Sequence, residues 1–226
     1  MFEKEFRWVQ GVPELQEISA DTTENGRFYT TPTGIYPSVT TILSIIQKDG
    51  LKAWRERIGD AEADRILHQA GVRGTAIHNM AEAYLKGEDW KRGAMPANIM
   101  SFKPIQKVLY EHVDDVYYIE APLYSKYLRT AGRVDLIAKF DGIRSVIDFK
   151  TSRINKTEDM IENYFMQESA YAVMFEELTG KGIRQLVTIM TSDDDPNALV
   201  FIKDRDEWIS KFVETRRLYD EQKAAL

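Results

Sequence analysis

The feature that most constrains the fold is a block of three extended segments in the middle of the chain. Residues 116–125, 130–142 and 144–152 are rich in β-branched and aromatic residues, which favour strands. Asp141-Gly142 separates the last two segments and is typical of a two-residue hairpin turn. The sequence therefore predicts three successive strands, of which the last two form a hairpin.

Helical patterns lie on both sides of this block. Ser38 precedes a helical spacing of apolar residues and reads as an N-cap. A polar helix is expected to follow, with a break at Gly71 and Gly74, and Gly180 is expected to close a helix after the strands. The remaining predicted segments are an irregular start over 1–37 with a turn-rich hairpin at 25–34, helices at 51–70, 75–87, 96–111, 158–179 and 204–224, and strands at 184–192 and 198–203.

This order predicts an α/β fold in which a central mixed sheet is flanked by helices. A length of 226 residues suits one domain with a substantial core. We expect that domain to consist of a helical N-terminal part (36–111) with a candidate arch, a sheet core (112–203) and a C-terminal helix (204–226).

Composition excludes several functions. The chain has no cysteine, which rules out disulfides, a thiol nucleophile, cysteine-bound zinc and an iron–sulfur cluster. No apolar run approaches the length of a membrane span, and the start MFEKEFRWVQ is unlike a signal peptide. We therefore expect no membrane partner and a cytoplasmic location. The net charge of −6 argues mildly against a nucleic-acid binder. Local clusters of basic residues count more than the total, however, and the sequence contains such clusters.

The strand SVIDFKTS carries an aspartate and a lysine two residues apart. Strand side chains alternate, so Asp148 and Lys150 share one face. Across the hairpin, Asp135 is nearly equidistant from the turn, so its carboxylate is expected close to that of Asp148. Two buried carboxylates need a cation, and hard oxygen ligands suit Mg²⁺ or Mn²⁺. The competing interpretation is an ordinary ion pair between Lys150 and one aspartate.

Two helical pairs add candidate ligands. His78 and Glu82 are four residues apart on one helical face, and a histidine near carboxylates can bind a metal. On local grounds alone, a helical histidine hydrogen-bonded to Glu82 or to a backbone group is the favoured interpretation. Gln167 and Tyr171 form a second such pair, although Tyr171 also fits the apolar stripe of its helix and Gln167 could be a surface residue.

Taken in order, these motifs resemble a known family. His78, GRVD with Asp135, DFK with Asp148 and Lys150, and Q-x-x-x-Y with Gln167 and Tyr171 are similar to the RecB-like branch of the PD-(D/E)XK nuclease superfamily. The stretches YPSVTTIL (36–43) and RGTAIH (73–78) resemble the mitochondrial genome maintenance exonuclease group and its phage and bacterial relatives. The resemblance spans roughly residues 36–175. No Pro-Asp dipeptide stands at Asp135, and Asp148 stands where glutamate is frequent.

The resemblance implies a restriction-endonuclease-like core and a metal-dependent deoxyribonuclease. It makes Asp135, Asp148 and Lys150 catalytic, and it implies one or two Mg²⁺ or Mn²⁺ ions with no iron–sulfur cluster. The implied metal ligands are His78, Asp135, Asp148 and the Phe149 carbonyl, with Glu82 or Glu120 as candidates for a second ion.

It also implies that DNA is the partner. We expect single-stranded or frayed ends to be preferred, in replication, recombination or repair, together with a protein of one of these processes. The expected location becomes the cytoplasm of a bacterium or of a phage-infected host. The expected DNA-binding residues are Ser38, Thr40, Thr41, Arg133, Arg153, Gln167 and Tyr171; the first three open a helix whose N–H groups can bind phosphate, although Ser38 and Thr41 also fit an ordinary capping box.

Three other functions stay open at this point. An endonuclease that cuts flaps or duplex sites would share the same catalytic core. An inactive nucleic-acid-binding or assembly module could keep the fold, although it has no reason to keep Asp135, Asp148 and Lys150 together. An acidic interaction protein unrelated to nucleases would make the order of motifs accidental.

Overall fold

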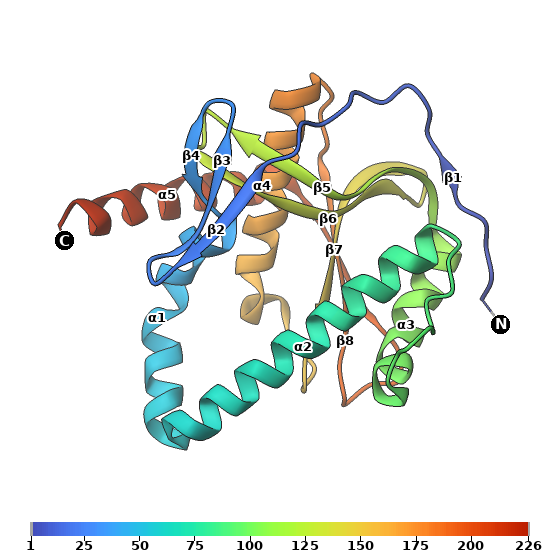
Figure 1. Cartoon of the computed structure of the whole chain (residues 1–226), viewed down its shortest axis with the longest axis horizontal. Coiled ribbons are helices and arrows are strands. Elements are labelled where there is room, and N and C mark those ends of the chain that lie inside the picture. The colour runs from blue at the N-terminus through green and yellow to red at the C-terminus, as the bar shows by residue number, and fades with distance from the viewer. Residues whose placement is uncertain (1, 226) are drawn as a thin grey trace.

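A six-stranded mixed sheet forms the centre of the molecule. The computed structural model describes residues 2–225, and Figure 1 shows the sheet with helices packed around it. The strand order is β1-β5-β6-β7-β8-β9; β1 runs parallel to β5 and β7 parallel to β8, and the other pairs are antiparallel. The strands are β1 (Arg7–Trp8), β5 (Val113–Ser125), β6 (Thr130–Phe140), β7 (Ile143–Thr151), β8 (Gln185–Thr191) and β9 (Leu199–Asp204).

Helices cover both faces of this sheet, which confirms the predicted α/β class. Ile147 and Phe149 of β7 pack against α2 and α3, whereas Val146 packs on the opposite face with residues of α1, α4 and α5. Because strand side chains alternate between faces, successive residues of β7 pack into two separate cores, one on each side of the sheet. The helices are α1 (Val39–Ile58), α2 (Asp60–Leu85), α3 (Pro96–His112), α4 (Glu162–Thr179) and α5 (Arg205–Ala224), with a short 3₁₀ turn η1 (Glu158–Met160) before α4.

The N-terminal region is more regular than the sequence predicted. Its segment 25–34 does turn back on the chain, but it forms the middle of a three-stranded antiparallel sheet rather than a lone hairpin. Tyr29 and Tyr36 pack from this sheet onto Ala131 at the start of β6. The strands are β2 (Ser19–Thr23), β3 (Gly26–Thr31) and β4 (Gly34–Pro37). The small sheet is therefore attached to the large one through a shared apolar contact.

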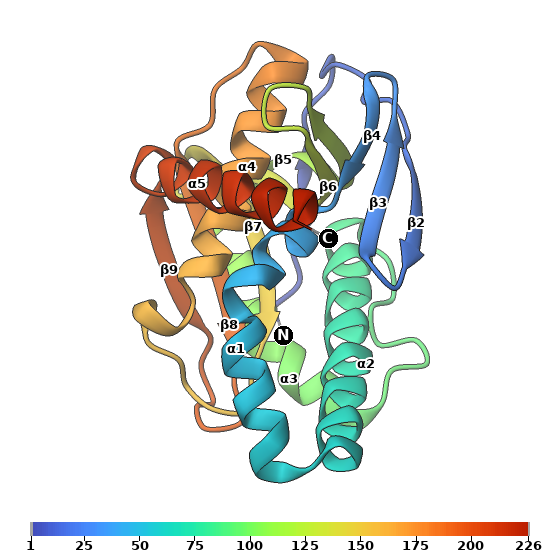
Figure 2. The same cartoon turned by 90° about the vertical axis from the view of Figure 1, so that its left-hand side faces the viewer.

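The predicted helix break at Gly71 and Gly74 is wrong. Both glycines lie inside α2, and the chain turns instead at Gly59, whose φ of 86° lies in the left-handed region. A glycine inside a helix costs only about 1 kcal/mol relative to alanine, so it does not by itself end the helix. Figures 1 and 2 both show α1 and α2 meeting at this point as a helical hairpin that extends away from the three-stranded sheet.

A Gly71→Ala variant is expected to be more stable than the parent. The added Cβ meets no atom within 4 Å, and alanine removes backbone freedom from the unfolded chain, which is worth roughly 0.5–1 kcal/mol. Gly59→Ala is the matched control and should be destabilising, because alanine disfavours a φ of 86°. Thermal melting of the two variants gives the answer, and a lower melting temperature for Gly71→Ala would contradict a continuous α2.

Among residues 2–225, no helix combines the length and the apolar character that crossing a membrane requires.

Candidate active site

Three acidic residues stand side by side across three neighbouring strands. Ile119 pairs with Leu136 and Ala121 with Val134, so Glu120 of β5 lies opposite Asp135 of β6. The hairpin register, in which Leu136 pairs with Ile147, continues to place Asp135 opposite Asp148 of β7. The Asp141-Gly142 turn and the period of two therefore bring the two predicted aspartates together, as expected.

His78 of α2 lies over this carboxylate row. Its Nδ1 is 3.5 Å from Asp135 Oδ1 and 3.7 Å from Glu120 Oε1. Its Nε2 is 3.0 Å from the carbonyl oxygen of Phe149, which the family resemblance had implied as a metal ligand. The backbone N–H of Phe149 donates to Asp135 Oδ2 at 2.9 Å. Residue 149 thus fixes both the histidine ring and the buried carboxylate.

Asp148 and Lys150 form an ion pair on the opposite side of β7 from Phe149. The other carboxylate oxygen, Asp148 Oδ1, accepts a hydrogen bond of 3.0 Å from the Gln167 side chain of α4. Lys150 Nζ also lies 5.0 Å from the ring centroid of Tyr164, which gives a cation–π contact. Gln167 is therefore a buried partner of the aspartate and not a surface residue.

The electrostatics of the cluster favour the charged forms of its two basic side chains, His78 and Lys150. Burial disfavours the imidazolium of His78, but Asp135, Glu120 and Asp148 outweigh that effect and raise the pKa of His78 to about 9. Burial likewise opposes the charge of Lys150, yet Asp148 and Asp135 keep its pKa above the ordinary value. Burial and the charge of Asp148 together raise the pKa of Asp135 to about 7. Two cationic side chains thus compensate the carboxylates in the metal-free protein.

The donor set fits a hard divalent cation. One ligand atom each from His78, Glu120 and Asp135 lies within 4.8 Å of the other two. Two carboxylates and one imidazole suit Mg²⁺ or Mn²⁺. Asp148, predicted as a ligand, lies beside this group with its oxygens directed to Gln167 and Lys150. It can bind a metal ion only if one of these contacts gives way.

Glu168 is a site residue that the sequence analysis missed. It lies next to Gln167 on α4, is fully buried, and accepts a hydrogen bond from Thr188, which pairs with Asp148 across β7 and β8. Burial and the nearby charge of Asp148 raise its pKa well above the usual range, which favours the neutral acid. The available signal was its position as the only acid in the apolar run 165–175.

Of the two glutamates considered for a second ion, only Glu120 reaches the cluster. Its backbone has a φ of 48°, a conformation that costs a residue with a side chain about 1–3 kcal/mol. The Arg133 side chain donates to the Glu120 carbonyl and forms an ion pair with Glu17. Arg133, predicted to bind DNA, therefore supports the strand that presents Glu120. Glu82 instead pairs with Lys86 at 2.6 Å.

The residues predicted to bind DNA differ in where the structure places them. Ser38 caps α1 by accepting from the Thr41 N–H at 3.0 Å, and the Thr41 hydroxyl is bonded to the backbone of Arg27, so both groups serve the capping alternative. Thr40 is exposed beside them, and Arg153 is exposed after β7. Tyr171 is buried against Gly132, where even a Cβ would approach its ring to 2.8 Å, which agrees with a core position.

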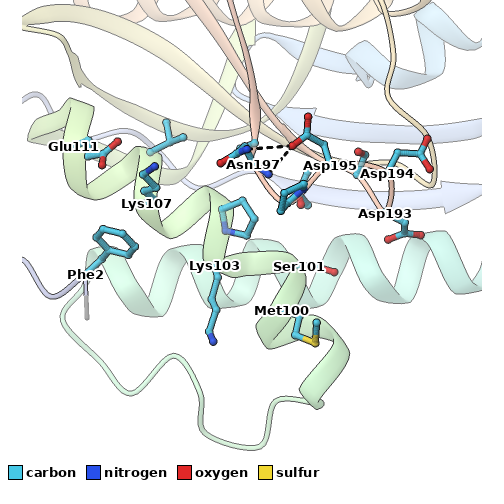
Figure 3. A pocket seen from close by; sticks show the side chains of 16 residues that line it. Phe2, Met100, Ser101, Lys103, Lys107, Glu111, Asp193, Asp194, Asp195 and Asn197 are labelled. Atoms are coloured by element: carbon cyan, nitrogen blue, oxygen red, sulfur yellow. Dashed lines mark hydrogen bonds between the residues drawn. The ribbon is translucent and has the colours of Figure 1, made fainter.

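A larger cleft lies elsewhere on the molecule. Its volume is about 720 Å³, and it is lined by α3 and by the turn between β8 and β9. Figure 3 shows Asp193, Asp194 and Asp195 gathered on that turn, with Lys103 directed away from them. None of the carboxylate-row residues lines this cleft. The chemistry is therefore concentrated at the sheet and not in this cleft.

Comparison with known proteins does not assign a class. A scan against protein-family models finds no match for this chain, and a search of curated proteins finds no similar sequence. The inference of function therefore depends on the geometry of the site.

Proposed function

We propose that this protein is a Mg²⁺- or Mn²⁺-dependent deoxyribonuclease that hydrolyses phosphodiester bonds as an exonuclease. One observation carries the proposal: Glu120, Asp135 and Asp148 line up on adjacent strands, with His78 over them and Lys150 beside them. An ordinary structural ion pair needs one acid and one base. This site has three acids, a histidine and a lysine, and four of these five residues come from adjacent strands. Such a set suits a charged substrate and a metal.

Lys150 supplies the positive charge that phosphoryl transfer requires. Because Asp148 and Asp135 keep its pKa above the ordinary value, Lys150 is an ammonium group at neutral pH. It can stabilise the negative charge that develops on the phosphoryl oxygens and orient the attacking water. It is unsuited to accept a proton while these carboxylates remain ionised. Gln167 holds Asp148, and the Phe149 backbone holds His78 and Asp135, so the cluster is ordered before substrate binds.

A metal ion fits this cluster at His78, Glu120 and Asp135, and Asp148 could contribute to it or to a second ion. Such an ion would polarise a phosphate oxygen and lower the pKa of a bound water. Histidine must be neutral to bind a metal, so the raised pKa of His78 implies that a proton leaves when the ion binds.

The arrangement of the sheet also supports a restriction-endonuclease-like core. The antiparallel β5-β6-β7 block carries the acids, and α4 crosses between the parallel strands β7 and β8 while contributing Gln167. DNA ends are the proposed substrate, within replication, recombination or repair.

Digestion of end-labelled DNA is the direct test. Linear and circular single-stranded DNA, labelled at the 5′ or the 3′ end where ends exist, are incubated with the protein and Mg²⁺ or Mn²⁺. We expect linear strands to be degraded and circles spared, with EDTA abolishing the reaction. Cleavage of circles would make the protein an endonuclease, and intact substrates under every metal condition would contradict nuclease activity.

A further inference from the structure

A small cleft lies just beyond the end of β7. Its volume is about 290 Å³, which corresponds to roughly ten water molecules. One wall is α2, contributing Arg65, Gln69 and Arg73, and the other is the chain segment 151–153. Thr151 directly follows Lys150 and ends β7, and Arg153 lies three residues beyond Lys150 in the chain. The cleft is therefore a neighbour of the proposed active site.

The lining of this cleft is basic although the chain as a whole is acidic. Arg65, Arg73 and Arg153 line it together with a single acid, Asp193. Arg65 is also paired with Glu62 on its own helix. Arg153 is exposed and forms no ion pair within residues 2–225. By contrast, the 720 Å³ cleft combines two lysines with four acids. A concave site with excess positive charge concentrates anions.

Arg73 is held in the cleft without having its donors satisfied. Its Nη1 forms an ion pair of 2.7 Å with Asp193, which ties α2 to the turn after β8. Its Nε and Nη2 atoms are buried and have no hydrogen-bond acceptor. A buried donor without a partner is costly, and the guanidinium fork matches the oxygens of a phosphate.

We propose that the cleft between α2 and residues 151–153 is a binding subsite for a phosphate of the nucleic-acid strand whose cleavage is proposed above. Arg73, anchored by its ion pair with Asp193, provides a guanidinium fork, and Arg153 provides an exposed charge. The subsite holds the strand just beyond the end of β7, whose last residue Thr151 directly follows Lys150. It rests on the proposed function for the identity of its ligand, but the binding can be measured without cleavage.

The test is binding of a fluorescent 12-nucleotide single strand in EDTA, followed by fluorescence anisotropy at several salt concentrations. Arg73→Gln and Arg153→Gln should each weaken binding on the order of tenfold, the scale of one charged hydrogen bond. The slope of log affinity against log salt should fall by about 0.7 for each phosphate that a variant no longer neutralises. Because both arginines address the same phosphate, the decrease in slope of the double variant should reach about 0.7 in total and not twice that value.

Arg217→Gln is the matched control, because it removes one exposed arginine from α5, where the side chain pairs with Glu221. It should bind with the affinity and salt slope of the parent. Melting curves of all variants show whether the fold is kept. Arg73→Gln and Arg153→Gln proteins that are folded and match the parent in affinity and slope would overturn the subsite.

The two proposals fail separately. If the parent binds the strand and the variants show the expected decrease in slope, but the parent cleaves nothing, the subsite is supported and the nuclease proposal is overturned. If the parent cleaves DNA but the variants bind the strand as the parent does, the nuclease proposal is supported and the subsite is overturned. Oligonucleotides with a 5′-phosphate, a 3′-phosphate or no terminal phosphate identify which phosphate is bound. If the variants lose affinity only for strands phosphorylated at one end, the subsite binds that terminal phosphate. If they lose affinity equally for all three strands, it binds an internal phosphodiester.

Discussion

A Lys150→Met variant is expected to lose cleavage by about 10²–10³-fold or more, the effect of removing one group that stabilises developing charge. Methionine keeps most of the volume and the apolar stem of the lysine, while it removes the charge and with it the cation–π contact to Tyr164. Binding of Mn²⁺ should change little, because Lys150 is not a ligand. Rates of single-strand digestion and a metal titration measure the two effects. A folded variant with turnover like that of the parent would remove Lys150 from the catalytic residues.

This substitution also leaves the 1%-exposed Asp148 without its cation. Breaking a buried ion pair in this way costs about 3–5 kcal/mol, so a loss of activity could reflect a loss of structure. The double variant Lys150→Met/Asp148→Asn separates the two causes, since it removes both charges and keeps an acceptor for Gln167. It should melt closer to the parent than the single variant does, and it should remain inactive. Recovered activity in the double variant would mean that the charge pair serves folding alone.

Saturating Mn²⁺ is expected to raise the melting temperature of the parent protein substantially. Binding to the folded state alone stabilises it by about 2.7 kcal/mol at a hundredfold excess over the dissociation constant. For a chain of this size, each kcal/mol of added stability raises the melting temperature by roughly 2–4 °C. The physical source is the repulsion among Glu120, Asp135 and Asp148, which the metal relieves. Melting curves with Mn²⁺, with Mg²⁺ and with EDTA measure the shift.

An Asp135→Asn variant should respond differently with and without metal. Asparagine removes one charge from the row and can still accept the Phe149 N–H, so in EDTA the variant should be at least as stable as the parent. With Mn²⁺ it should gain little stability and cleave nothing. A variant that Mn²⁺ stabilises as strongly as it stabilises the parent would show that Asp135 does not hold the ion.

The part of the site that the sequence predicts is the part set by local rules. The Asp141-Gly142 turn fixes the register of β6 against β7, so the positions of Asp135 and Asp148 follow from counting residues. The helix start at Ser38 and the helix end at Gly180 follow from capping preferences in the same way. Each of these features depends on a few neighbouring residues and needs no knowledge of tertiary packing.

The part that could not be predicted depends on contacts between distant segments. Glu120 joins the row through the register of β5 against β6, which contains irregularities at Val113–Tyr118 that no short motif announces. The inward position of Glu168 depends on α4 being enclosed by the sheet and by other helices. The turn at Gly59 rather than at Gly71 depends on its left-handed backbone, and glycine content alone does not distinguish the two positions.

The helical hairpin of α1 and α2 has a consequence for how the molecule opens. Between residues 44 and 76 only Ala63 is buried, so the end of the hairpin around Gly59 contributes little to either core. Segments with few buried contacts exchange their amide hydrogens through local opening, at free energies well below that of global unfolding. The amides on both sides of Gly59 should therefore exchange early, while those of β6 and β7 persist. The arginines on the α2 wall of the cleft beside residues 151–153 thus belong to an element that can loosen while the carboxylate row stays in place.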